Sequence, residues 1–370
     1  MSSAASATLN NRWPPQIKYI VGNEACERFS FYGMKGILVG YMTSQVLKGG
    51  LNMSDDKATS IFHLFVFANY FMPLLGAWLS DKIFGRYHTI LWVSLFYCLG
   101  HGTLAMSDLF TSVDGKFNLL CVGLSLIAFG AGGIKPCVSA FMGDQFKSDQ
   151  GHLLQKAYGA FYWSINFGSF FSFIAIPRIR EAFGYGWAFG VPGILMGIAT
   201  VIFWLGRKHY VRVPPTRESK RAGFFAVTWY ALTHGSERKS GQKFWDVARN
   251  KFTNEEVDAA KSVGPILSIF ALIPAFWALF DQSNSTWVLQ GNKMVFIPLT
   301  GFWKSALGWF FGDQITAENM QSANPAIVML LVPLLTLGVY PRLKTWTTPL
   351  RRMGCGMFIA AFSYVIVGWL

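Results

Sequence analysis

The chain has 370 residues, of which 52% are hydrophobic and only 14% are charged. Soluble domains contain about a quarter charged residues, so this composition excludes an ordinary soluble protein and indicates one that lies in lipid. The net charge of +13 does not indicate nucleic-acid binding, because the basic residues fall in alternate loops between apolar segments.

The polar residues 1–11 precede the first apolar stretch, and no small-residue cleavage site follows them. We therefore expect no signal peptide, and we expect the first span to stay in the mature protein. The five cysteines all fall in apolar segments without metal-ligand spacing, so we predict neither a metal site nor a disulfide. No set of nucleophile and base stands out, and the sequence does not indicate an enzyme.

Apolar segments of about 20 residues predict transmembrane helices, and hence an all-α membrane protein. Ser54, followed by Asp55 and Asp56, predicts an N-cap and an acidic first turn for the second helix. We expect nine spans, at residues 17–47, 58–80, 88–107, 117–140, 157–177, 187–206, 265–284, 325–340 and 350–370.

Lysine and arginine gather in the loops after spans two, four, six and eight, which predicts a cytoplasmic N-terminus. The loop after span five, with Arg178, Arg180 and Glu181, is a minor exception. In the loop after span two, Asp81 and Arg86 are either ordinary residues of a positive-inside loop or a cytoplasmic latch between spans.

A polar connection divides the chain into three predicted domains: a six-helix half at 1–206, the connection at 207–264, and a three-helix part at 265–370. The connection is basic, and we interpret residues 244–261 as an amphipathic helix on the cytoplasmic membrane face. Thr253 and Glu256 stand at capping-box spacing within it. Residues 285–324 are predicted to form a long outer loop whose aromatic side chains rest on the interface.

The first span carries charges that a passive membrane anchor would not keep. Glu24, Arg28, Tyr32 and Lys35 fall along one stripe of a helix, with Glu27 beside it. Each charge inside a span costs about 2.5–3.5 kcal/mol on the insertion scale, so the stripe must face protein or water. It is either a structural ion-pair cluster between helices or, by default, part of a functional pathway.

Two further ionisable residues lie inside predicted spans. Lys135 follows a glycine-rich segment of the fourth span that permits close helix packing, and it needs an acidic partner at membrane depth. We expect that partner to be Glu24 or Glu27, an arrangement suited to a proton relay. His63 in the second span is interpreted equally as a packing residue or as a proton carrier.

Polar side chains in the later spans predict a polar cavity with aromatic walls. Tyr162 and Asn166 lie in the fifth span, Trp277 and Asp281 in the seventh, and Asn324 opens the eighth. Such a cavity suits a small polar solute.

On two long motifs in order, the sequence resembles the proton-dependent oligopeptide transporter family, a branch of the major facilitator fold. The family motif E-x-x-E-R-F-x-Y-Y-G corresponds to residues 24–33, with Phe31 in place of the first tyrosine. The motif F-Y-x-x-I-N-x-G-S matches residues 161–169 without exception. The segments 132–137, 143–146 and 276–282 look like those of animal-type peptide transporters and their bacterial relatives.

The resemblance implies proton-coupled symport of di- and tripeptides by alternating access, with protons as the coupling ion and no other cofactor. The implied residues fall into three groups, for proton coupling, peptide binding and gating: Glu24, Glu27, Arg28, His63 and Lys135; Tyr32, Lys35, Tyr70, Tyr162, Asn166, Trp277 and Asn324; and Asp81, Arg86 and Asp281. The family usually has arginine at the position of Lys35, and lysine lacks the planar fork for a carboxylate.

A facilitator fold has two six-helix halves, whereas only three spans follow the connection here. The resemblance therefore implies that helices ten to twelve are missing, and we expect a truncated chain that transports poorly by itself. Two other functions stay open: proton-coupled transport of nitrate or another small solute, and a transport-inactive subunit that binds peptide or a partner. A plasma or inner membrane location is expected.

Overall fold

The structure is a computed structural model, and it describes residues 12–216, 222–238, 241–294, 298–343 and 348–369. Every regular element in these ranges is a helix. Contacts divide the chain into two compact units, Met1–Pro215 with Ser283–Thr345, and Thr216–Gln282 with Trp346–Leu370. The predicted domain boundaries at 206 and 264 follow the polar connection rather than contacts, and they stay a prediction.

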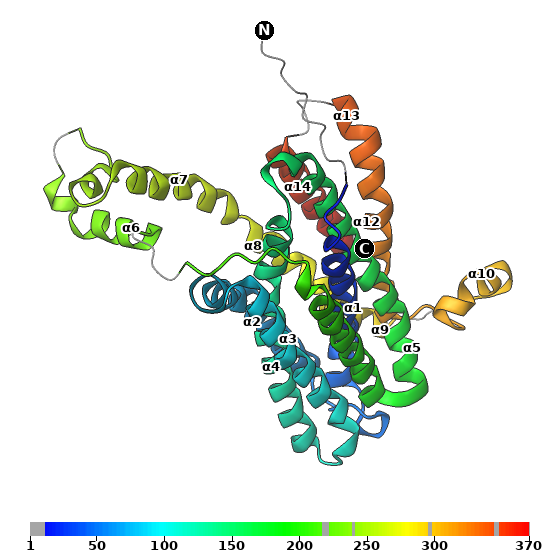
Figure 1. Ribbon diagram of the computed structural model, residues 1–370. Coiled ribbons are helices and arrows are strands. Elements are labelled where there is room, and N and C mark those ends of the chain that lie inside the picture. The colour runs from blue at the N-terminus through cyan, green and yellow to red at the C-terminus, as the bar shows by residue number, and fades with distance from the viewer. Residues whose placement is uncertain (1–11, 217–221, 239–240, 295–297, 344–347, 370) are drawn as a thin grey trace, which may run out of the picture. The chain divides into compact units, whose positions relative to one another are not determined.

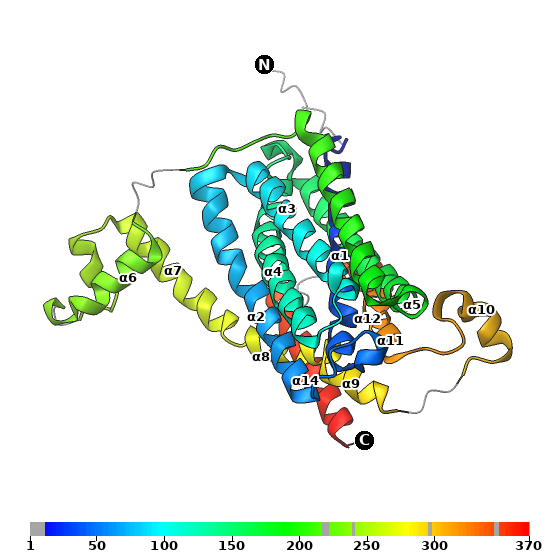
Figure 2. The ribbon, with the colours of Figure 1, turned by 90° about the horizontal axis from the view of Figure 1, so that it is seen from below.

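The first unit is built on five long helices that lie side by side (Figures 1 and 2). The Ser54 side chain accepts a hydrogen bond from the Lys57 amide, which confirms the predicted N-cap. Gly85, with φ of 76°, turns the chain between the second and third of these helices. The helices are α1 (Ile17–Thr43), α2 (Asp55–Leu79, with a π-turn at Ser80–Phe84), α3 (Arg86–Ala105), α4 (Val113–Gly143) and α5 (Gly151–Leu205).

Helix α5 contains both the fifth and the sixth predicted spans. Its two parts meet at Gly184, whose φ of 87° and ψ of 179° lie outside the helical region. The predicted loop at 178–186 is therefore wrong, since the chain stays helical on both sides of this one glycine. The Asp108 carboxylate accepts a hydrogen bond from the Gly186 amide at 2.7 Å and so helps to start the second part.

Close approach between α2 and α4 depends on glycine, as the glycine-rich segment of the fourth span predicted. A Cβ on Gly76 would lie 2.5 Å from the Gly133 Cα, so the two backbones touch. Small residues at a helix crossing give membrane helices their packing energy, because lipid offers no hydrophobic drive to associate.

Gly76→Ala is expected to destabilise the chain by about 1–3 kcal/mol, because the added methyl group overpacks this crossing. Gly102→Ala in α3 is the matched control, since nothing lies within 4 Å of its Cβ position. The control is expected to be neutral or to stabilise, because alanine has the higher helix propensity. Thermal unfolding in detergent measures both, and equal midpoints would contradict the packing argument.

The segment after Ser283 that belongs to the first unit is more helical than the predicted outer loop. It contains α9 (Thr286–Asn292), α10 (Gly301–Phe311) and α11 (Ala317–Met320). Helix α12 (Ala323–Pro333) then continues through a π-turn at Leu334–Val339 into α13 (Tyr340–Leu343). This helix is longer than the predicted span at 325–340.

The second unit contains α6 (Phe224–Thr233), α7 (Asn254–Phe270), α8 (Ile273–Phe280) and α14 (Pro349–Trp369). The predicted capping box is confirmed, and it places the start of α7 after Thr253. The amphipathic helix predicted at 244–261 is therefore wrong in its bounds, because Asp246–Asn250 forms a separate 3-10 turn. Helix α6 was not predicted.

Six described helical stretches are long and apolar enough to cross a membrane. They contain the second to eighth predicted spans, and one stretch, Ser148–Lys208, holds both the fifth and the sixth. Helices α1 and α14, which hold the first and ninth predicted spans, are outside this set. Among the described helices, α1 alone buries four charged side chains, those of Glu24, Glu27, Arg28 and Lys35, and these lead to the candidate site.

Candidate functional site

Helix α1 buries two carboxylates and one guanidinium in the first unit. Glu24, Glu27 and Arg28 are 1%, 0% and 8% exposed. The Arg28 Nε lies 2.6 Å from the Glu24 Oε1 and 3.0 Å from the Glu27 Oε2. Within the described part of the chain, Glu24 Oε2 and Glu27 Oε1 have no hydrogen-bond partner. Two acids thus share one base, and a proton on either acid would remove an uncompensated buried charge.

Lys135 on α4 does not form the ion pair that we expected. Its ammonium lies 4.3 Å from the centroid of the Phe31 ring and 6.0 Å from that of Tyr70. No carboxylate of the described residues comes within 4.0 Å of it, because Arg28 already holds the nearby acids. A cation over an aromatic face is stabilised by the ring quadrupole, although less than by a full ion pair.

Tyr32 and Lys35 lie about one and two turns after Arg28 on α1, and His63 lies on α2. Lys35 is buried, and its ammonium is 5.4 Å from the centroid of the Phe62 ring on α2. The neighbouring His63 places its Nε2 3.2 Å from the Ser285 hydroxyl. The Tyr32 ring lies 5.8 Å from that of Phe173 on α5.

Helix α5 contributes Tyr162 and Asn166 from the second motif. The Asn166 side-chain amide donates to the Tyr162 carbonyl at 2.9 Å, so it satisfies its own helix backbone. Tyr162 is exposed. Two residues after Asn166, a Cβ on Gly168 would lie 3.2 Å from the Arg28 Cβ, so this glycine lets α5 pack directly on the charged part of α1.

Arg86 of the predicted cytoplasmic latch binds a carboxylate at the end of α4. Arg86 Nη1 donates to both carboxylate oxygens of Asp144, at 2.5 Å each, and so joins the start of α3 to the end of α4. Asp81 is exposed and is not the carboxylate that Arg86 binds. Asp144 lies in the segment 143–146 that resembles animal-type peptide transporters, and the sequence alone did not indicate a role for it.

The remaining predicted residues are spread over both units. Trp277 lines an apolar cavity of about 390 Å³ in the second unit with Phe276 and Met353. Asp281 follows the last residue of α8 in that unit, and Asn324 is an exposed residue of α12. A second cavity, of about 450 Å³, lies between α2 and α9 and includes none of the predicted peptide-binding residues.

A buried histidine on α3 was missed. His101 is 0% exposed, its Nε2 lies 2.9 Å from the Ser30 hydroxyl of α1, and its ring stacks on Tyr97. Tyr97 is also fully buried. The signal was a histidine one turn after a tyrosine, but a sequence does not show that this pair faces the charged helix.

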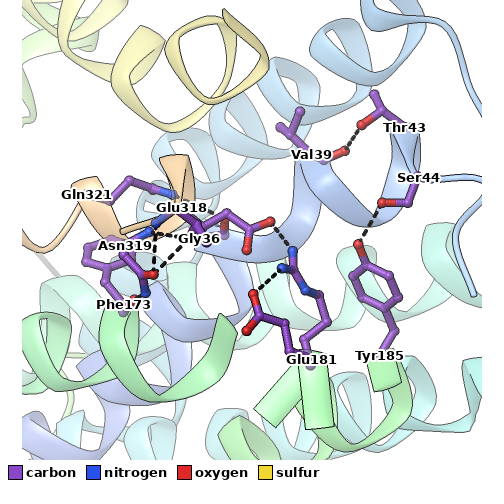
Figure 3. A network of polar contacts seen from close by, with 12 residues as sticks. Gly36, Val39, Thr43, Ser44, Phe173, Glu181, Tyr185, Glu318, Asn319 and Gln321 are labelled. Carbon is purple, nitrogen blue, oxygen red and sulfur yellow. Dashed lines mark hydrogen bonds and ion pairs between the residues drawn. The ribbon is translucent and has the colours of Figure 1, made fainter. Parts of the chain in front are cut away.

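A polar network between α5, α11 and α1 was also missed (Figure 3). Arg180 forms ion pairs with Glu318, which is 2% exposed, and with Glu181. Beside it, the Asn319 amide donates to the Phe173 carbonyl at 3.0 Å, and the Gln321 amide donates to the Gly36 carbonyl at 3.2 Å. These contacts hold α11 and the residue after it against α5 and α1, which precede the connection at 207–264.

Arg180→Glu is expected to destabilise the first unit by about 1–3 kcal/mol, because it adds a third carboxylate beside those of Glu181 and the buried Glu318. The double variant with Glu318→Arg should recover most of this loss by restoring opposite charges. Lys304→Glu breaks the exposed ion pair with Asp313 and is the matched control, with an effect below about 1 kcal/mol. Chemical unfolding in detergent measures all three, and failure of the double variant to recover would contradict the pairing.

Comparisons with known proteins show the family to which this chain belongs. The sequence profile of the POT family matches residues 87–370. Peptide transporter 3 of Caenorhabditis elegans is 38% identical over 97% of this chain and 51% of its own length. Solute carrier family 15 member 2 of Homo sapiens is 36% identical over 96% of this chain and 49% of its own. The chain therefore spans about half the length of these curated relatives.

Solved structures give the same result. The crystal structure of the POT family transporter PepTSo aligns with a TM-score of 0.80 at 40% identity, over 96% of this chain and 76% of that one. An auto-inhibited POT family peptide transporter aligns with a TM-score of 0.77, also at 40% identity. The charged motif on α1 and the asparagine motif on α5 thus belong to a multi-pass membrane protein of the major facilitator type, and the chain is a member of the POT family of transporters.

Proposed function

We propose that this chain acts in the proton-coupled import of di- and tripeptides by alternating access. The observation that carries the proposal is the pair of buried acids, Glu24 and Glu27, sharing the single base Arg28 on α1. The names of the relatives as peptide transporters support the choice of solute. Protons are the coupling ion, and no other cofactor is needed.

In the proposed cycle, a proton neutralises one of the two acids. Arg28 then holds one carboxylate instead of two, and the electrostatic attraction that fixes α1 near Lys135 weakens. Because α1 packs on α5 at Gly168, a small movement of α1 is transmitted to the neighbouring helix. Peptide would bind to Tyr32 and Lys35 at the C-terminal end of the charged stripe on α1, and to Tyr70 on α2.

We further propose that the chain lies in the plasma or inner membrane with its N-terminus in the cytoplasm. The basic loops after the second and fourth spans support this orientation, with Lys82, Arg86, Lys147 and Lys156 on the same side. Accessibility of an N-terminal tag to protease in sealed cells tests it. Cleavage from outside would contradict it.

Lys35→Met is expected to weaken dipeptide binding about tenfold, because it removes the buried cation that would hold the peptide carboxylate. The measurement is a titration of the reconstituted chain with a labelled dipeptide. Binding rather than flux is measured, because the proposed role of Lys35 is to contact the peptide. Lys57→Met, an exposed lysine on α2, is the control and should bind as the unaltered chain does.

A competition panel tests the class of solute in the same assay. Unlabelled di- and tripeptides should displace the probe, whereas nitrate and free amino acids should not. Displacement by nitrate at similar concentrations would contradict the peptide assignment and favour a small anion.

A further inference from the structure

Helix α6 in the second unit has two unlike faces. Val227 and Ala231 are fully buried against Ala248 and Val257, in a small core that belongs to the connection. The opposite face is apolar as well, yet it is open. There Phe225, Trp229 and Leu232 are 85%, 70% and 60% exposed.

These three residues form one continuous row. Their spacing of four and three residues places them on one side of a helix. Helix α6 contains no charged residue, and the row itself consists only of apolar and aromatic side chains. Large apolar side chains that are gathered in one exposed patch indicate an interaction surface, whereas scattered ones do not.

The sequence around α6 carries a strong positive charge. Residues 207–243 contain nine lysines and arginines against two acids, Glu218 and Glu237. Of these, Arg238 and Lys243 follow α6 closely and are exposed. An exposed aromatic row within a basic segment complements a surface that is apolar below and anionic above, as an anionic lipid leaflet is.

Chain connectivity keeps α6 near such a surface. The helix follows the membrane stretch that ends at Lys208 and precedes the stretch that begins at Asn254. Fifteen residues, 209–223, lead from the first stretch to α6, and they allow it to reach the headgroups without leaving the membrane's vicinity.

We propose that α6 is a lipid-docking helix that lies in the plane of the anionic leaflet. Phe225, Trp229 and Leu232 enter the boundary between headgroups and acyl chains, while Arg238 and Lys243 contact the headgroup phosphates and carboxylates. The docking holds the connection between the two parts of the transporter against the membrane. It does not depend on which solute is carried.

The test uses the full chain in nanodiscs of phosphatidylcholine, with and without phosphatidylserine. A trace of photoactivatable phosphatidylserine, with its diazirine near the headgroup, is cross-linked, and the modified peptides are mapped by mass spectrometry. We expect cross-links in residues 222–238. Phe225→Ser with Trp229→Ser should lower them several-fold.

Two variants separate the apolar from the electrostatic contribution. Arg238→Glu with Lys243→Glu should lower the preference for phosphatidylserine by about 25-fold, since each of the two basic residues at the surface adds about fivefold. Phe302→Ser with Trp309→Ser, which removes exposed aromatics of α10, should leave the cross-links at 222–238 unchanged. Unaltered thermal unfolding of each variant shows that the chain still folds.

The proposal is overturned if the cross-links at 222–238 are absent, or if they are equally strong without anionic lipid. It is also overturned if α6 cross-links to a second copy or to another protein instead of lipid. If the unaltered chain binds no peptide but still shows the cross-links at 222–238, the proposed function is contradicted and the lipid docking of α6 is supported.

Discussion

Replacing Arg28 with methionine is expected to destabilise the folded chain by about 3–5 kcal/mol, because it leaves two buried carboxylates without their common base. Arg28 is itself only 8% exposed, and it contacts Glu24 and Glu27 at 2.6 and 3.0 Å. Methionine keeps much of the side-chain length, so the loss reports on charge more than on packing. Unfolding in detergent, followed by circular dichroism, measures the change.

Replacing a neighbouring acid is expected to lower the stability much less. Glu27→Gln removes one of two negative charges that share one positive charge, so it should cost far less than Arg28→Met. Lys48→Met, at an exposed lysine after α1, is the control for loss of a cation and should be nearly neutral. A similar loss for Glu27→Gln and Arg28→Met would show that the cluster is a balanced structural ion pair and not an acid-rich site.

Local spacing made this part of the site predictable. Residues four apart on a helix face each other, so Glu24 and Arg28 were expected on one stripe, and they form an ion pair. The N-cap at Ser54 and the capping box at Thr253 are equally local, because each involves backbone groups within three residues. In each case one short segment contains every partner.

Contacts between distant segments could not be predicted in this way. Arg180 and Glu318 are 138 residues apart, and Arg86 and Asp144 are 58 apart. A single sequence shows the charge of each residue but not which helices meet, so Arg180 was seen only as an exception to the loop-charge pattern. The ion pair predicted for Lys135 was wrong for a related reason. Arg28 binds the carboxylates of Glu24 and Glu27 instead, and the distances that decide this are not visible in the sequence.

The predicted bounds of some helices were wrong, because charge and backbone conformation gave different indications. Charged residues at 178–181 indicated a loop, yet Gly184 alone breaks α5, because its positive φ is what interrupts helical hydrogen bonding. Helix α6 escaped notice because its ten residues are too short for a span and carry no polar face. Its significance comes from the exposure of Phe225 and Trp229, which only the folded chain reveals.

Glu24→Gln is expected to abolish the pH dependence of peptide binding. If a proton on the acid pair accompanies the peptide, the unaltered chain should bind a labelled dipeptide about tenfold more tightly at about pH 5.5 than at about pH 7.5. Glutamine resembles the protonated acid, so the variant should bind with one affinity at both values. Lys135→Ala should also lose the pH dependence, because it removes the positive charge beside Phe31 that responds to the acid pair.

Three outcomes distinguish the interpretations of the charged stripe. A flat profile in both variants, with normal dependence in the exposed control Glu237→Gln, supports proton coupling through α1. Persistence of the pH dependence in both variants would contradict that assignment and would move the proton to another titratable residue, with His63 and the fully buried His101 the next to be replaced. A flat profile in the unaltered chain would mean that its bound peptide is not coupled to protons. The charged stripe on α1 would then be a structural ion-pair cluster, held in the membrane for the fold alone.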